Sequence, residues 1–453
     1  MLESIREVLV RLLFVVAVLT VSPFIKEAYA DGSPLVSVDY TPTSLRLPDY
    51  YVNNPVHIHT RLGIDLLDDP IFTDVENHFA NMGAKVYTRW CKPKDQGAWW
   101  PSTVGVVNPL SNGRDLAQEM IDRAHENDLR IMQYQWHVSD EYMAQQDPNW
   151  ICIDENGAAI QSARGIFLCI NSPFRDYFTI RMLELFDRGA DGFYYDSEHM
   201  PPNGCWCVYC QAKYKGQTGF DPPTNHSYTN PDFVRYLQFK NESSEEGMRH
   251  YIQQAHLRKP GFPMLISTGH LPALHFPTMR SDLARIAPSQ KTEYTMPLRR
   301  HYSRLFWQTN TTIPAPLWDV QWAFAMTYHR DAGQGRPAHV WIYDMRTQDE
   351  ALSAAAACMT YGMIANLDIQ EETIPYSTKF KPALKMGENV APYIARTRPV
   401  RWAAIHFTER GRNMYLSDTT PGLETMYQKL IVPCWQSFRA LNRLRAPIGV
   451  VTD

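Results

Sequence analysis

The stretch that decides the fold is residues 189–210, GADGFYYDSEHMPPNGCWCVYC. A glycine-containing turn leads into a short aromatic strand at residues 193–195, which is followed by Asp196 and then by Glu198. A Cys-x-Cys-x-x-Cys cluster closes the stretch at residues 205–210. In a (β/α)8 barrel the chemistry lies on the loops that follow the parallel strands. The stretch therefore predicts an active-site acid at a strand end, beside a loop that is braced by cysteines.

Strand and helix patterns alternate along the rest of the chain, which indicates a parallel sheet. The expected strands are residues 56–59, 84–90, 130–136, 193–196, 263–267, 291–294, 338–343 and 363–366. Eight strands with intervening helices suit an α/β fold of the (β/α)8 TIM-barrel type. An open, doubly wound sheet is the alternative. No Gly-x-Gly-x-x-Gly turn follows the first strand, so neither that fold nor an organic cofactor is expected.

Both ends of the chain differ from this pattern. Residues 1–30 combine Arg6 and Arg11, an apolar run and the triplet Ala28-Tyr29-Ala30, as a signal peptide does. We therefore expect a periplasmic or secreted protein with no membrane contact after cleavage, and an uncleaved anchor is the alternative. The barrel is expected at residues 31–385. Residues 386–453 predict a strand, a helix and a strand, the start of a small flavodoxin-like α/β domain that is incomplete at the chain end.

Composition narrows the range of partners. The formal net charge is −4 and no stripe of Lys and Arg is present, which argues against nucleic acid and acidic membrane surfaces. The 12 Trp and 24 Tyr supply flat apolar faces with polar edges. Most will lie in the core, but a sugar-binding cleft also needs such faces.

The spacing of the cysteines favours a structural zinc site. Three of the eight cysteines, Cys205, Cys207 and Cys210, lie in one tight turn, and zinc takes four soft ligands in a tetrahedron. The expected fourth ligand is Cys169, which opens the segment Cys-Ile-Asn-Ser-Pro ahead of a helix. His199 is a substitute ligand. A disulfide among the three cysteines, or reduced buried thiols, are the alternatives that spacing leaves open.

Carboxylates at strand ends point to glycoside cleavage, which needs two carboxyl groups flanking the bond. The acids in such positions are Asp196, Glu198, Glu293, Asp344 and Asp368. We predict Asp196 as the nucleophile, Glu293 as the acid/base and Glu198 as the reserve acid. The alternative for Asp196 is a brace for its loop, and for Glu293 an ordinary surface carboxylate.

Other polar and aromatic residues near strand ends are candidates for substrate binding. The predicted substrate-binding residues are His59, His137, His270, Trp90, Trp100 and Asp344. A structural histidine and a core tryptophan are the competing interpretations.

These residues together resemble a known group of enzymes. Asp-Gly-x-x-x-Asp followed by Cys-x-Cys-x-x-Cys resembles the TIM-barrel enzymes called hypothetical glycosyl hydrolase 6, which are similar to family 29 α-L-fucosidases. The cysteines resemble the zinc site of family 42 β-galactosidases, in which an upstream Cys precedes an Asn-Ser-Pro-like helix start. The tail from Val400 resembles the start of the trimerisation domain of those enzymes.

The resemblance implies an exo-acting, retaining glycoside hydrolase, a glycoside substrate, a structural zinc and a homo-oligomer. The two relatives differ over Asp196. The fucosidase pattern makes it the nucleophile, whereas the β-galactosidase pattern has an Asn-Glu pair there, and this chain has Tyr195-Asp196. The fucosidase-like role is therefore favoured.

Two other functions remain as alternatives. A catalytically silent carbohydrate-binding barrel would keep the aromatic cleft but lack a converging pair of acids. A metal-dependent hydrolase would use His57 and His59 on the first strand together with Asp344, but no matching ligand pair is seen on later strands.

Overall fold

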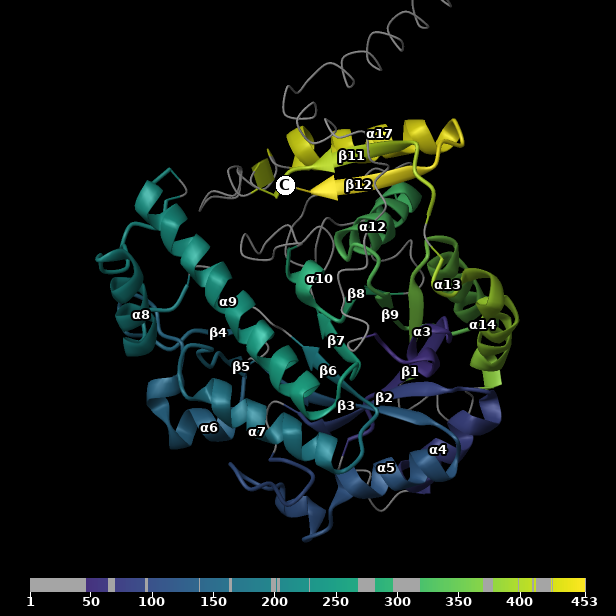
Figure 1. Ribbon diagram of the computed structural model, residues 1–453, viewed down its shortest axis with the longest axis horizontal. Helices are drawn as coiled ribbons and strands as arrows, with labels where there is room; N and C mark the ends of the chain where they lie inside the picture. The colour runs from purple at the N-terminus through teal and green to yellow at the C-terminus, as the bar shows by residue number, and fades with distance from the viewer. Residues whose placement is uncertain are drawn as a thin grey trace, which may run out of the picture. The chain divides into compact units, whose positions relative to one another are not determined.

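Eight parallel strands close into a barrel, as the sequence predicts (Figure 1). The computed structural model describes residues 46–452, except residues 64–69, 94–96, 138, 163–164, 197–200, 202–203, 228, 268–281, 296–317, 370–377, 398, 410, 413–424 and 426. The barrel strands are β1 Val56–Thr60, β2 Val86–Lys92, β3 Arg130–Trp136, β6 Gly192–Asp196, β7 Met264–Ser267, β8 Ser289–Thr295, β9 Ala338–Tyr343 and β10 Ile364–Ile369. Each predicted strand is present, and β10 closes the ring by pairing with β1.

Helices surround the barrel on its outer side (Figure 1). Those that belong to the barrel are α4 Pro70–Met82, α5 Leu116–Glu126, α6 Glu141–Gln146, α7 Phe174–Asp187, α8 Val208–Thr218, α9 Pro231–Arg258, α10 Asp282–Ile286, α12 Trp318–Ala332, α13 Gln348–Thr360 and α14 Lys381–Ile394. Between β3 and α7 lie a small antiparallel pair, β4 Gln161–Ser162 and β5 Gly165–Ile166, which the sequence did not predict.

Alternation along the strands divides the side chains into two sets. Residues such as Ile58, Tyr195 and Ile342 face the helices and join the main apolar core. Side chains of the other set face the barrel axis, and Val86, Met132, Tyr134, Tyr194, Leu265 and Trp341 form a second cluster with Leu47 and Tyr51, which precede β1. Because successive side chains in a strand point to opposite faces, Tyr194 and Asp196 lie on the axial side while Tyr195 does not.

The short helix α3 Asp49–Val52 contributes to the closure of the amino end of the barrel. Tyr51 on this helix is fully buried, and its hydroxyl lies 2.7 Å from that of Ser289, the first residue of β8. The carboxyl ends of the strands therefore form the end at which chemistry is expected.

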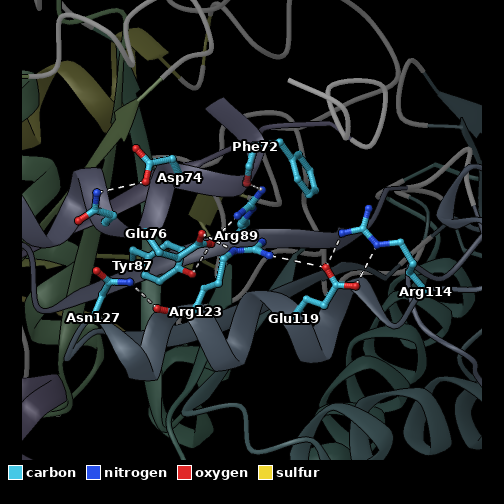
Figure 2. A network of polar contacts seen from close by, with 10 residues as sticks. Phe72, Asp74, Glu76, Tyr87, Arg89, Arg114, Glu119, Arg123 and Asn127 are labelled. Atoms are coloured by element: carbon cyan, nitrogen blue, oxygen red, sulfur yellow. Dashed lines mark hydrogen bonds and ion pairs between the residues drawn. The ribbon is translucent and has the colours of Figure 1, made fainter. Parts of the chain in front are cut away.

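A buried ion network joins α4, β2 and α5 (Figure 2). Glu76 accepts hydrogen bonds from Tyr87 Oη at 2.9 Å, from Arg89 Nη1, and from Arg123 Nε at 3.0 Å. Arg89 also donates to the carbonyl of Phe72 at 3.0 Å. The carboxylate thus neutralises a fully buried guanidinium, and its loss would leave that charge without compensation.

We expect Glu76→Gln to lower the free energy of unfolding by about 3–5 kcal/mol, the usual consequence of removing one partner of a buried ion pair. Glu119→Gln is the matched control, because Glu119 pairs with Arg114 on the partly exposed side of α5 and reaches Arg123 of the network only across 3.7 Å. Such a pair contributes about 0–1 kcal/mol. Urea unfolding of both variants is the measurement, and equal losses would contradict this role of burial.

The C-terminal residues form a β-α-β unit, as predicted. β11 Ala403–Phe407 and β12 Ile448–Thr452 are parallel, and α17 Val432–Arg443, preceded by a π turn at Tyr427–Ile431, connects them. Asp331 of α12 ties the unit to the barrel, because its carboxylate accepts from Arg401 Nη2 at 2.6 Å and from the amide of Val450 at 2.8 Å. Helix α14 packs on α13 and β1 and runs to Ile394, across the boundary at residue 385, which stays a prediction.

No helix among the described residues is long and apolar enough to span a bilayer. The predicted signal peptide lies outside the described residues.

Candidate active site

Asp196 is the last residue of β6 and lies on the axial side of the barrel at its carboxyl end. Its carboxylate is held by two tyrosines: Tyr134 Oη donates to Oδ2 at 2.8 Å, and Tyr194 Oη donates to Oδ1 at 2.9 Å. Burial, followed by the negative charge of Asp196, raises the pKa of both tyrosines well above the usual range. Both therefore stay protonated donors at any working pH, and Asp196 is fixed in one orientation.

A buried lysine links Asp196 to the second predicted acid. Lys291 Nζ on β8 donates to Glu293 Oε1 and to the hydroxyl of Tyr194, and lies 3.9 Å from Asp196 Oδ1. The ammonium also lies over the rings of Tyr194 and Trp341, 4.7 and 4.4 Å from their centroids. Lys291 is 1% exposed, whereas the Glu293 side chain keeps 18% exposure.

The structure thus brings Asp196 and Glu293 together. Because Lys291 Nζ lies 3.9 Å from Asp196 Oδ1 and hydrogen-bonds closely to Glu293 Oε1, these two oxygens are less than about 6.5 Å apart. Carboxyl separations of about 5–5.5 Å belong to retaining glycosidases and about 6.5–9.5 Å to inverting ones. The upper limit on the oxygen–oxygen distance fits the retaining range better than the inverting one, and retention itself stays a prediction.

A second charged group lies on the β1 and β10 side of the same barrel end. Asp368 on β10 accepts a hydrogen bond from Arg61 Nη2 at 2.9 Å, and His59 Nε2 is 3.6 Å from its other oxygen. Burial lowers the pKa of His59 well below its usual value, so the ring is neutral. Arg61 remains 39% exposed and lies 5.3 Å from the ring centroid of Tyr343. The guanidinium is therefore the accessible part of this group.

The stability of the protein should depend on the protonation of Asp368. Burial raises the pKa of this carboxyl from 3.8 to about 6, although Arg61 opposes the shift. The folded state then binds the proton more tightly than the unfolded chain, so the stabilisation is complete below about pH 4 and is lost as the pH rises through 6.

We expect the free energy of unfolding of the wild type, minus that of Asp368→Asn, to fall by about 1–3 kcal/mol between pH 4 and pH 7. Urea unfolding at several pH values gives this difference. A difference that is constant, or that grows with pH, would show that the carboxyl is not protonated preferentially in the folded protein.

Aromatic side chains line the axial side near Asp196. Trp90 is half-buried, and its ring centroid is 5.3 Å from that of Tyr134. The ring centroid of Trp136 lies 6.1 Å from that of Tyr134. Trp90 therefore lies beside Tyr134, which contacts Asp196, and its role in sugar stacking stays a prediction.

Two of the predicted substrate-binding residues lie elsewhere. His137 is buried in the helix layer, where Nε2 is 3.0 Å from Tyr195 Oη and 3.1 Å from Tyr251 Oη. Trp100 is fully buried, and its indole donates to Glu184 of α7 at 2.7 Å. The structure contradicts a direct role in sugar binding for both residues, because each is enclosed by helices on the outer side of the barrel.

Of the remaining predicted residues, the structure describes Asp344. Asp344 directly follows β9, is exposed and has a left-handed backbone with φ 58°. Glu198, His199 and His270 lie outside the described residues.

Sequence reasoning missed Lys291, Arg61 and the tyrosine pair. A usable signal existed for the lysine: in Lys291-x-Glu293 the two side chains must face the same side of one strand. No comparable local signal points to Tyr134, because its contact with Asp196 comes from the pairing of β3 with β6.

The four predicted metal ligands also come together. Cys169, Cys205, Cys207 and Cys210 are buried, and their sulfur atoms all lie within 4.8 Å of one another. Zn–S bonds of about 2.3 Å in a tetrahedron place sulfurs about 3.8 Å apart. The set therefore suits a zinc ion in both geometry and ligand type. Asn171 Nδ2 contacts Cys210 Sγ at 3.3 Å, the outer-shell contact that a thiolate ligand accepts.

A fifth cysteine, which the sequence did not single out, lies against this set. Hydrogen bonds from the thiol of Cys152, and then from those of the other three cysteines, lower the pKa of Cys205, while burial raises that of Cys152. An antiparallel bridge between Ile151 and Leu168 brings Cys152 close to Cys169, because each cysteine directly follows one of the paired residues. Among the described residues, the four predicted cysteines form a group that could hold a metal ion.

A closed (β/α)8 barrel with converging carboxylates at its carboxyl end is the architecture of many glycoside hydrolases. The comparisons relate the chain to that class. Residues 74–197, which run from α4 to the residue after Asp196, match the family model described as hypothetical glycosyl hydrolase 6. No curated protein sequence matches the chain.

Solved structures of glycosidases share the fold. α-L-Fucosidase isoenzyme 2 from Paenibacillus thiaminolyticus is 16% identical with a TM-score of 0.62, over 88% of this chain and 57% of the fucosidase. The β-galactosidase from Rahnella sp. R3 is 13% identical with a TM-score of 0.64, over 90% of this chain and 66% of its own. The β-galactosidase from Bacillus circulans sp. alkalophilus is 13% identical with a TM-score of 0.65, over 88% of this chain and 65% of the β-galactosidase. The chain thus spans less than two thirds of the length of each.

Proposed function

We propose that the chain is a retaining, exo-acting glycoside hydrolase. The observation that carries the proposal is the convergence of Asp196 and Glu293 on Lys291 at the carboxyl end of the barrel. A pair of carboxyl groups in this position is what cleavage of a glycosidic bond requires.

In this proposal Asp196 attacks the anomeric carbon. Tyr134 and Tyr194 hold the carboxylate and keep its orientation fixed. Glu293 gives its proton to the leaving oxygen and later removes one from the water that releases the sugar. The partial exposure of Glu293 supports this part, since the group must meet both the departing alcohol and the incoming water.

The substrate is proposed to be an α-L-fucoside-like or β-galactoside-like sugar, because structures with those names share the fold. The residue before Asp196 is Tyr195 and not Asn, which supports the fucoside-like choice. Trp90 and Tyr343 offer aromatic faces beside the carboxylates, and the exposed part of Arg61 offers donors for sugar hydroxyls.

We further infer that Cys169, Cys205, Cys207 and Cys210 hold a structural zinc. Four protein ligands leave no open coordination position, so such an ion braces the loop after β6 and takes no part in catalysis. The N-terminal segment supports export to the periplasm or the medium, and association of copies is a further proposal from the resemblance of the tail to a trimerisation domain.

A panel of aryl glycosides tests the function. The full chain is incubated with α-L-fucosides, β-galactosides and other pyranosides, and release of the aryl alcohol is followed. Proton NMR of the first product then shows its anomeric configuration. We expect one sugar to be released with retention; inversion would replace the covalent mechanism, and no cleavage across the panel would remove the hydrolase.

A further inference from the structure

Charged groups of alternating sign lie around the barrel axis near the carboxyl ends of the strands. In order they are Asp196, Lys291, Glu293, Arg61 and Asp368. Lys291 is the buried cation of this series and the one that contacts both proposed catalytic carboxylates. A buried ammonium is costly unless its partners compensate it, so its presence between the two acids needs a physical reason.

We propose that Lys291 stays paired with whichever of Asp196 and Glu293 carries the negative charge at each stage of the reaction. This role rests on the proposed function. It makes Lys291 a positioning residue for both carboxylates, one that does not itself touch the reacting atoms.

The charges balance through the first step. Before the first step, Asp196 is ionised, Glu293 is protonated and Lys291 is positive, so the charges of the three side chains sum to zero. When Asp196 forms a bond to the anomeric carbon, the bond to the leaving oxygen breaks and that oxygen takes the proton of Glu293. The negative charge has then moved from Asp196 to Glu293, and the sum is still zero.

The geometry allows one ammonium to serve both states without moving. Lys291 Nζ donates to Glu293 directly, and it reaches Asp196 across 3.9 Å and through the hydroxyl of Tyr194, which accepts from Lys291 and donates to Asp196. In a buried site the Coulomb energy of such pairs is larger than in water. The negative charge therefore moves from Asp196 to Glu293 beside a fixed positive charge. The fixed positive charge lowers the free-energy barrier of this step.

Other groups face Lys291 and must be considered in any pH experiment. Tyr194, Asp196, Glu293 and Trp341 contact Lys291, and His59 on β1 interacts with its charge. The further groups, which interact with Asp196 or Glu293, are Tyr134 on β3, Tyr343 on β9, Arg61 after β1 and Asp368 on β10. Burial keeps the tyrosines protonated and His59 neutral. Burial raises the pKa of Asp368 to about 6, so its contribution is measured separately with Asp368→Asn.

The test is the pH–rate profile of Lys291→Met, which removes the charge and keeps the length of the side chain. The ionised form of each acid then lacks its counter-charge. Asp196 must lose its proton for activity and Glu293 must keep its own, so both limbs of the profile should move to higher pH by about one unit or more. Lys291→Arg keeps the charge and should leave both limbs in place, even if kcat falls.

Two further variants make the result specific. Tyr194→Phe removes the bridge to Asp196 alone, so the acidic limb should move and the basic limb should stay. Lys92→Met is the matched control, because Lys92 is also fully buried against a carboxylate, Asp140 Oδ2 at 2.9 Å. Its profile should not move, whatever happens to its stability.

A measurement without substrate covers the case in which turnover is too weak. The stability of the wild type minus that of Lys291→Met should rise as the pH increases through the titration of the carboxyl groups, because the ammonium stabilises their ionised forms. An active wild type with unmoved limbs in Lys291→Met, or a stability difference without this rise, would overturn the role of Lys291. A wild type that cleaves no glycoside would overturn the proposed function and this role together.

Discussion

Asp196→Asn is expected to lower kcat on the responsive glycoside by about 10³-fold or more while the protein stays folded. An amide cannot attack the anomeric carbon as a carboxylate does, so covalent catalysis is lost. The shape of the side chain is kept, and one amide oxygen can still accept from Tyr134 or Tyr194. We therefore expect a change in the free energy of unfolding of only about 1 kcal/mol. Steady-state kinetics and thermal unfolding of the same sample provide the measurement.

Asp191→Asn is the matched control for this prediction. Asp191 directly precedes β6, at the opposite end from Asp196, and is also buried, accepting from the amide of Ile131 at 3.1 Å and lying 2.8 Å from His125. Its loss should reduce stability and leave kcat within a few-fold of the wild type. Wild-type kcat in Asp196→Asn, or an equal loss of kcat in both variants, would contradict the assignment of the nucleophile.

Cys205→Ser is expected to cause a large loss of stability together with a loss of bound metal. Binding of a structural zinc is part of the folding free energy, which reaches about 10 kcal/mol or more for small zinc peptides. Removing one of four thiolates should therefore leave the loop after β6 without its brace. We expect a loss of at least about 3 kcal/mol in the free energy of unfolding, and zinc content falling from one equivalent towards zero.

Two cysteine controls separate zinc binding from ordinary packing. Cys358→Ser changes a buried thiol on α13, away from the cluster, and should keep full zinc content. Cys152→Ser removes the fifth thiol and should also keep the zinc, because four ligands remain. Elemental analysis and unfolding curves give the result. A Cys205→Ser protein as stable as Cys358→Ser, or a wild type without metal, would exclude the structural zinc.

The barrel could be predicted from the sequence because each strand is a short apolar run bounded by turn residues. Strands such as β9 Ala338–Tyr343 are buried on both faces, which gives a strong local signal. The position of Asp196 followed from its place after an aromatic strand. Likewise, three cysteines in one turn could be recognised from their spacing alone.

The partners of these residues could not be predicted in the same way. His137 follows β3 directly, and its ring packs against Tyr195, which faces the helices; alternation along the strand would have indicated this side. Trp100 lies in a loop beyond β2, where alternation gives no guidance. Lys291 and Tyr134 meet Asp196 through the packing of different strands, and a single sequence carries little trace of such contacts.

The most direct test of the account is to trap the covalent intermediate. The full chain is treated with a fluorinated aryl glycoside of the sugar that the panel identifies, in which fluorine at C2 slows release of the bound sugar. Mass spectrometry of the digested protein then locates the added mass. We expect one sugar on Asp196. A sugar attached to a different residue, or no adduct in a protein that cleaves the parent glycoside, would contradict the central claim that Asp196 is the nucleophile.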